Sequence, residues 1–86
     1  MYEVVLSKRF KKDYQKIVKK NQQVKKKVVK TLTLLTSNVN RPSLRLHKLS
    51  RLNNWSVSVT GDLRIIFQID GNMILCTRIR THDEVY

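Results

Sequence analysis

The stretch that decides the fold runs from Trp55 to Arg80 and reads WSVSVTGDLRIIFQIDGNMILCTRIR. Apolar and polar residues alternate along it with a period of two, which is the repeat of a β-strand with one buried face. The pairs Gly61-Asp62 and Asp70-Gly71 interrupt the alternation and are typical of tight turns. The stretch therefore predicts three antiparallel strands joined by two hairpin turns.

The alternation also assigns the two faces of these strands. In the second and third strands, every second residue is mostly apolar and is expected to face the core: Leu63, Ile65, Phe67, Ile69, Met73, Leu75, Thr77 and Ile79. Arg64, Arg78 and Arg80 lie between these positions and are expected to face the other way. The same period continues to His82. In a short strand expected before Trp55, Leu44 and Leu46 alternate with Arg45, which turns His47 away from the core. We expect guanidinium and imidazole groups to meet on an open face of the sheet.

The residues before the sheet follow a helical repeat instead. A strand-like run at residues 2–6 is followed by Ser7, whose hydroxyl suits a helix N-cap. Apolar stripes then predict two helices, over about residues 8–21 and 22–36, joined by a tight turn. The stripe residues are Phe10, Tyr14, Ile17, Val18, Val24, Val28, Leu32 and Leu35.

The predicted order of elements is β-α-α-β-β-β, an order of the α+β class. The two helices form a hairpin that packs on one face of a twisted antiparallel sheet, and the other face stays at least partly open. Residues 1–86 are too few for a second apolar core, so we expect a single domain.

The charge of the chain points to polyanionic partners. Its 18 Lys and Arg residues against 6 Asp and Glu give a formal net charge of +12. Between residues 8 and 30 lie 11 of these cations and one acid, Asp13, so the predicted helical hairpin is strongly basic. Such a charge attracts polyanions and makes their binding fall with added salt. It does not distinguish RNA, DNA and anionic lipid, and a permanent acidic protein partner also accounts for it.

Several classes of protein are disfavoured by the sequence. Cys76 is the only cysteine, which excludes an internal disulfide and a zinc site built on several thiolates. There is neither a glycine-rich phosphate loop nor an HExxH motif, so we expect no metal and no cofactor. No apolar run approaches the roughly 18 residues that cross a bilayer. Residues 1–6 lack the basic flank of a signal peptide, so we expect a cytoplasmic protein without a membrane partner.

The residues of the open face suit RNA cleavage. Breaking an RNA phosphodiester bond needs a base for the 2′-hydroxyl, cations for the charge on the phosphorus oxygens, and an acid for the 5′ oxygen. Histidine, arginine and Tyr86 supply such groups. Simpler interpretations stand beside this one. Arg78 and Arg80 also suit the protection of an edge strand by charge, Asp62 suits its turn, and the phase of Trp55 favours the core over base stacking.

Taken together, the motifs of the chain resemble a known family. After a short strand and a basic helical hairpin come Leu44-Arg45-Leu46-His47-Lys48-Leu49, Asn54-Trp55-Ser56-Val57, Leu63-Arg64-Ile65-Ile66-Phe67 and Thr81-His82-Asp83-Glu84-Val85-Tyr86. In order and spacing they are similar to the RelE superfamily, nearest its YafQ-like branch, over residues 1–86.

The resemblance implies an activity and two partners. The activity is that of an mRNA interferase, a ribosome-dependent endonuclease that cuts message in the ribosomal A site without a metal and leaves a 2′,3′-cyclic phosphate. The chain would be the toxin of a type II toxin–antitoxin pair, neutralised by a cognate acidic antitoxin in a hetero-oligomeric complex.

The resemblance also assigns residues, matched by position. His47, Arg64, His82 and Tyr86 are expected to be catalytic, and Asp62 falls near an acidic residue of the family site that would orient a neighbour. Roles in binding RNA or phosphate are expected for the remaining cations near the site: Arg45, Lys48, Arg78 and Arg80.

Two residues depart from the family pattern, and two alternatives stay open. Arg51 and Arg80 stand where glycine is common, which adds bulk and charge near the expected site. One alternative is a ParE-like toxin that inhibits gyrase without cutting RNA; the two histidines and Tyr86 favour the nuclease over it. The other is a non-catalytic module that binds RNA or the ribosome.

Overall fold

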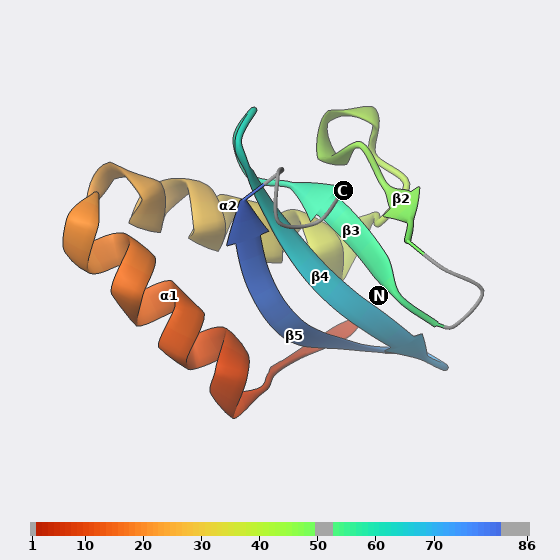
Figure 1. The fold of residues 1–86 in the computed structure, drawn as a ribbon. Helices are drawn as coiled ribbons and strands as arrows, with labels where there is room; N and C mark the ends of the chain where they lie inside the picture. The colour runs from red at the N-terminus through yellow and green to blue at the C-terminus, as the bar shows by residue number, and fades with distance from the viewer. Residues whose placement is uncertain (1, 50–52, 82–86) are drawn as a thin grey trace.

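Two helices cover one face of a five-stranded sheet in the computed structural model, which describes residues 2–49 and 53–81 (Figure 1). The elements in chain order are β1 (Glu3–Leu6), α1 (Lys8–Lys20), α2 (Gln23–Ser37), a 3₁₀ helix (Pro42–Leu44), β2 (His47–Lys48), β3 (Trp55–Ser58), β4 (Leu63–Asp70) and β5 (Met73–Thr81). The strands lie side by side in the order β1-β5-β4-β3-β2. The predicted α+β class and the basic helical hairpin on one face are thus confirmed.

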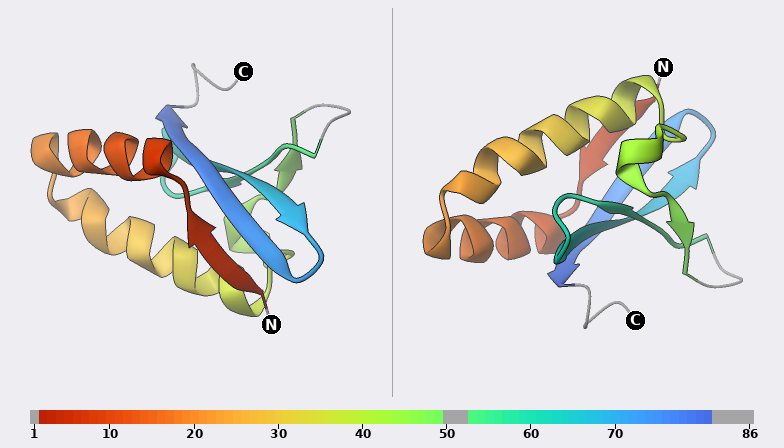
Figure 2. Two further views of the ribbon diagram at one scale, coloured as in Figure 1. Left: turned by 90° about the horizontal axis from the view of Figure 1, so that it is seen from below. Right: turned by 90° about the horizontal axis from the view of Figure 1, so that it is seen from above.

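The helices form where their apolar stripes and caps predict them. The Ser7 hydroxyl accepts a hydrogen bond from the backbone N–H of Phe10 at 3.1 Å, which caps α1. In the turn between the helices, the Asn21 side chain accepts one from the N–H of Gln23 at 3.1 Å. Phe10 from α1 and Val28 and Leu35 from α2 are buried against the sheet. Figure 2 shows both helices on the same side of the twisted sheet.

The first strand differs from the prediction of a purely antiparallel sheet. β2, β3, β4 and β5 pair antiparallel in succession, but β1 pairs with β5 in parallel, from Glu3 beside Met73 to Leu6 beside Cys76. Tight turns reverse the chain between β3, β4 and β5, whereas β1 is connected to the rest of the sheet through both helices. A connection of that length permits a parallel pair, so the sheet is mixed.

The strand expected around Leu44 and Leu46 is also shorter than predicted. Leu44 is buried at the end of the 3₁₀ helix, and Arg45 adopts a left-handed backbone conformation with φ of 49°. Such a residue cannot continue a strand. β2 therefore contains only His47 and Lys48.

A β-bulge in β5 changes which residues face the core. Ile66 of β4 pairs with Arg78 and Phe67 pairs with Cys76, so Thr77 is an extra residue in β5. The expectation that Met73, Leu75, Thr77 and Ile79 share the core face is therefore wrong. The residues of β5 that are buried are Ile74, Cys76 and Ile79.

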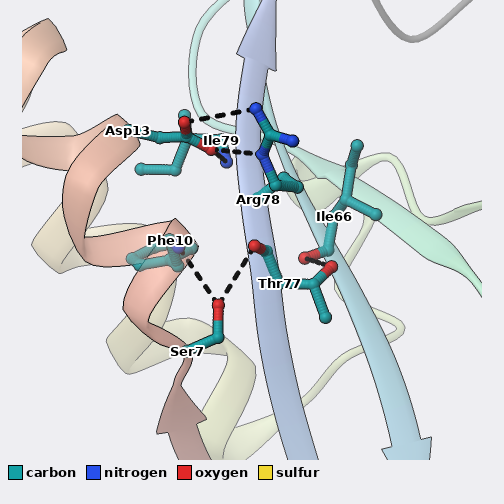
Figure 3. A network of polar contacts seen from close by, with 7 residues as sticks. All are labelled: Ser7, Phe10, Asp13, Ile66, Thr77, Arg78 and Ile79. Carbon is teal, nitrogen blue, oxygen red and sulfur yellow. Dashed lines mark hydrogen bonds and ion pairs between the residues drawn. The ribbon is translucent and has the colours of Figure 1, made fainter.

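Two hydroxyl groups hold this bulge in place (Figure 3). The Thr77 hydroxyl donates to the carbonyl of Ile66 at 3.2 Å, and the Ser7 hydroxyl donates to the carbonyl of Thr77 at 3.1 Å. Ser7 therefore caps α1 and fixes the bulge with the same oxygen. Arg78 and Arg80 follow Cys76 by two and four residues. Without the extra residue they would project to the same face as Cys76, toward the core.

Candidate functional site

The sheet face opposite the helices, called here the outer face, gathers several predicted site residues. Residues that pair across neighbouring strands project to the same face. His47 of β2 pairs with Ser56 of β3, and Arg64 of β4 pairs with Arg80 of β5. Their chain neighbours Ile65 and Ile79 are buried on the helix side, which leaves these four residues on the outer face.

Hydrogen bonds hold the side chain of Arg64 in place. Its side chain is buried, with the whole residue 7% exposed. Nε donates to the Ser56 hydroxyl at 3.0 Å, and Nη2 donates to the backbone carbonyl of Arg45 at 2.7 Å. A guanidinium is costly to bury unless hydrogen bonds compensate it. These two bonds fix its orientation, so Arg64 is a cation set in place before any ligand binds.

Two features of this cation's setting escaped prediction from the sequence. The acceptor at Arg45 is a backbone carbonyl, presented by the left-handed conformation of that residue, and nothing in the sequence marks it. Ser56 has a small polar side chain, which does not by itself predict burial, yet it is fully buried. The alternation on either side of the Gly61-Asp62 turn places Ser56 and Arg64 on the same face of the sheet. This was the feature of the sequence that could have predicted their contact.

Arg80 and His47 flank this fixed cation. Arg80 is half-buried and directly beside Arg64 in the strand register, so two guanidinium-bearing residues stand on adjacent strands. Like charges in that position repel and favour a bound anion. His47 is exposed on the edge strand β2, next to the Ser56 that holds Arg64. The outer face thus combines a preset cation, a second cation and an imidazole.

Arg78 forms an ion pair with Asp13 of α1. Its Nε lies 2.7 Å from Oδ2 of Asp13 in α1, and its Nη2 lies 3.4 Å from Oδ1 (Figure 3). The backbone N–H of Ile79 also donates to Oδ2 of Asp13, at 3.1 Å. One carboxylate therefore binds an arginine and a backbone N–H of β5 beyond the end of β1. The sequence alone did not connect these residues, which are 65 positions apart.

Lys48 and Asp62 take other places in the fold. Lys48 alternates with His47 and pairs with Trp55, whose ring centroid is 5.4 Å from its Nζ, in the range of a cation–π contact. Trp55 packs partly buried against the core, as its phase predicted. Asp62 is exposed in the turn before β4, and its backbone N–H donates to the Thr60 hydroxyl at 3.2 Å.

The remaining predicted residues fall at the limits of the described chain. His82, Tyr86 and Arg51 lie outside residues 2–49 and 53–81. β5 reaches Thr81, the residue after Arg80. The backbone of the outer face is thus described up to the residue before His82.

Cys76 takes no part in the outer face. It is fully buried on the helix side, and burial raises the pKa of its thiol to about 12 from the usual 9.0. A thiol in that state is a poor nucleophile and a poor metal ligand. Within residues 2–49 and 53–81, no three His, Cys, Asp or Glu side chains gather as a metal site would need. None of the helices described there has the length and apolar character to span a membrane.

Nearly the whole sequence matches a family model. That family is described as the bacterial toxin of type II toxin–antitoxin systems, YafQ, and the match covers residues 2–86. This chain belongs to the YafQ toxin family. The resemblance to YafQ-like members of the RelE superfamily is thereby confirmed. No curated protein sequence is significantly similar to the chain.

Solved structures of YafQ-type and related toxins share the fold. YafQ in the DinJ-YafQ complex from E. coli is 22% identical with a TM-score of 0.79, covering 100% of this chain and 99% of that one. A toxin from Helicobacter pylori, solved bound to metal, is 27% identical with a TM-score of 0.73 and full coverage of both chains. The YoeB-YefM complex from Staphylococcus aureus matches at 19% identity and a TM-score of 0.75, covering 95% and 98%.

Proposed function

We propose that this YafQ family toxin is an mRNA interferase, a metal-independent endoribonuclease that cuts message in the A site of the ribosome. The observation that carries the proposal is Arg64, a buried guanidinium that Ser56 and the carbonyl of Arg45 hold on the outer face. Arg80 lies beside it, and His47 lies on the edge strand, paired with Ser56. Fixed guanidiniums supply the charge stabilisation that phosphoryl chemistry needs at the transition state.

The proposed reaction is attack by the RNA on its own backbone. A histidine, His47 or His82, removes the proton of the 2′-hydroxyl as the 2′ oxygen forms a bond to phosphorus. The bond from phosphorus to the 5′ oxygen breaks, and an acid returns a proton to that oxygen. The products are a 2′,3′-cyclic phosphate and a 5′-hydroxyl. Arg64 and Arg80 stabilise the charge on the phosphorus oxygens, and Tyr86 orients a reacting group or donates a proton.

Charge supports the ribosome as the site of action. The formal net charge of +12 favours an RNA-rich partner. A ribosome that positions the message against the outer face would supply the alignment that cleavage needs. The Helicobacter pylori relative was solved bound to metal. Cleavage that persists with a chelator selective for transition metals would support the metal-independent mechanism, since the Mg²⁺ of the ribosome remains.

An acidic antitoxin is the second proposed partner. The E. coli DinJ-YafQ structure is a toxin–antitoxin complex, and one chain of that complex and one chain of the YoeB-YefM complex share this fold. A cognate antitoxin of this chain would relieve the self-repulsion of the basic helical hairpin and cover the outer face in a hetero-oligomeric complex. We place both proteins in the cytoplasm, where the message is translated.

The test is to induce the protein in bacteria and map new 5′ ends of mRNA by primer extension. New ends within translated frames are expected, and Arg64→Ala should reduce them by about 100- to 1000-fold because a preset charge is lost from the transition state. His47→Ala and His82→Ala separate the two histidines. Arg41→Ala, which removes an exposed arginine before the 3₁₀ helix, is the control of equal charge.

Folding and the alternatives are controlled in the same experiment. Arg64→Ala leaves the hydroxyl of Ser56 and the carbonyl of Arg45 without this donor, so Arg64→Lys is tested beside it and thermal melts confirm that each variant folds. Intact message with growth arrest would instead indicate a ParE-like gyrase inhibitor. Intact message with retained ribosome binding would indicate a non-catalytic module.

A further inference from the structure

A second basic feature adjoins the outer face, between α1 and the end of β5. It is an open pocket of about 350 Å³, called here the α1–β5 pocket. Within residues 2–49 and 53–81, eight residues line it: Asp13, Lys16, Ile17, Lys20, Arg78, Ile79, Arg80 and Thr81. It lies where β5 has passed the end of its pairing with β1, at Leu6 and Cys76, so α1 rather than a strand covers this side of β5.

The charge of the pocket is strongly positive. Among the described residues, two lysines of α1 and two arginines of β5 line it against one acid, Asp13, which leaves these residues with an excess of three positive charges. That acid already accepts hydrogen bonds from Arg78 and from the backbone N–H of Ile79. Asp13 therefore serves the attachment of α1 to β5, and the two lysines remain on the rim as exposed cations.

The spacing of these cations also favours a bound anion. Lys16 and Lys20 are four residues apart, so they lie on the same side of α1, where like charges destabilise a helix. Arg80 stands beside Arg64 in the strand register. A polyanion that crosses both places would relieve both repulsions at once.

The lining matches a sugar–phosphate backbone. Lysine and arginine bind phosphate oxygens, and the half-buried Ile17 offers apolar surface for a ribose. Arg80 belongs both to this pocket and to the outer face, so a strand held at Arg64 has a continuous basic path into the pocket.

We propose that the α1–β5 pocket binds the backbone of single-stranded RNA on one side of the nucleotides placed on the outer face. This inference rests on the proposed function, and it adds Lys16 and Lys20 as binding residues outside the cleavage chemistry. The pocket contributes affinity and alignment, whereas the outer face performs the reaction.

The test compares two double variants of equal charge. Lys16→Gln with Lys20→Gln removes the rim of the pocket, and Lys25→Gln with Lys26→Gln removes two exposed lysines of α2 that do not line it. Each pair lowers the formal net charge from +12 by two, to +10. The probe is a short single-stranded RNA with 2′-O-methyl groups throughout, which cannot be cut by the proposed reaction. Fluorescence anisotropy gives its affinity at several salt concentrations, and circular dichroism confirms the helices.

The expected result is a specific loss in the pocket variant. Its affinity should fall about tenfold. Its slope of log affinity against log salt, which is negative, should become smaller in magnitude by about 1.4, because each phosphate of a single strand that a lysine neutralises contributes about −0.7 to that slope. The Lys25 and Lys26 variant should stay within about threefold of the parent with an unchanged slope. The probe reports binding whether or not the protein is a nuclease, so failure of the cleavage proposal appears only in the mapping of 5′ ends.

Two outcomes would overturn the inference. Equal losses in the two double variants would show that only net charge attracts the RNA and that the pocket is not a site. Unchanged RNA affinity in the pocket variant, together with weaker binding of a poly-glutamate peptide, would assign the pocket to an acidic protein partner instead.

Discussion

The two halves of β5 have different roles, and the bulge at Thr77 lies between them. Before the bulge, residues 73–76 pair with β1 on one side and β4 on the other, and they bury Ile74 and Cys76. After it, the strand pairs with β4, and α1 covers its other side through Asp13. The first half pairs along both edges, whereas the second half buries Ile79 and also carries the arginines of the outer face and the α1–β5 pocket. One strand thus builds a stable interior and a charged surface.

Deleting Thr77 should break this division most severely. The deletion restores an unbroken alternation, which turns Arg78 and Arg80 toward the core unless the strand loses its pairing. The cost of burying unpaired guanidiniums should lower the free energy of unfolding by more than about 3 kcal/mol. Chemical denaturation monitored by circular dichroism measures it.

The control for this deletion is Thr77→Val, which keeps the extra residue. It removes only the hydrogen bond from the hydroxyl to the carbonyl of Ile66, so a loss of about 1 kcal/mol is expected. If the deletion were no worse than the valine variant, the bulge would not determine the direction of the arginines.

Asp13→Ala should loosen the second half of β5 with a smaller effect. It removes the acceptor for Arg78 and for the N–H of Ile79, and the partly exposed ion pair limits the cost to about 1–2 kcal/mol. Hydrogen exchange should show faster exchange of the Ile79 amide, while the amides of Ile74 and Cys76 stay protected. This result would show that the second half of β5 can open while the first half stays closed.

The matched control is Glu3→Ala, which removes an exposed acid from β1 and changes the net charge equally. It should leave the Ile79 amide unchanged. Asp13→Asn keeps an oxygen for that amide and should fall between the parent and the alanine variant. Equal protection of the Ile79 amide in all these proteins would contradict a clamp at Asp13.

The smallest effect is expected in the first half of β5, and only at high pH. Burial raises the pKa of Cys76 to about 12 in the folded protein, so its thiol stays neutral there while the unfolded chain ionises above its usual 9.0. The contribution of this residue to stability is complete below pH 9 and is lost as pH rises from 9 toward 12. At pH 10 the loss is about 1 kcal/mol.

The measurement for Cys76 is a series of thermal melts from pH 7 to pH 10.5. Cys76→Ala gives the reference, because it lacks the titrating group while lysines and tyrosines titrate equally in both proteins. The stability difference between the two proteins should shrink above pH 9. A constant difference would show that the thiol is not shielded from water.

Much of the fold followed from the sequence because its signals are local. The helical stripes and the Ser7 cap placed both helices to within about two residues of their observed bounds. The alternation of Leu63, Ile65 and Phe67 correctly assigned the faces of β4. These features depend on neighbours a few residues away, which a single sequence displays.

The errors have a common physical cause, which is pairing between distant segments. The parallel pairing of β1 with β5 and the bond from Ser7 to Thr77 join residues about 70 positions apart. The bulge appears in the sequence only as an interrupted apolar repeat, with Ile74 and Cys76 in one phase and Ile79 in the other. Within the candidate site, the alternation of residues along the strands predicted that Arg64, Arg80 and His47 share the outer face. It gave no sign of the carboxylate of Asp13 beside Arg78.

The pairing of β1 with β5 has a consequence for how the protein is made. A chain grows from residue 1, so β1 has no strand partner until residues 73–76 have been synthesised and have left the ribosome. Pairing across that distance is slow, because a long loop must close first. Arg64 and Arg80 stand side by side through the pairing of β4 with β5, so the candidate site is completed only after nearly all of the described segment has been synthesised.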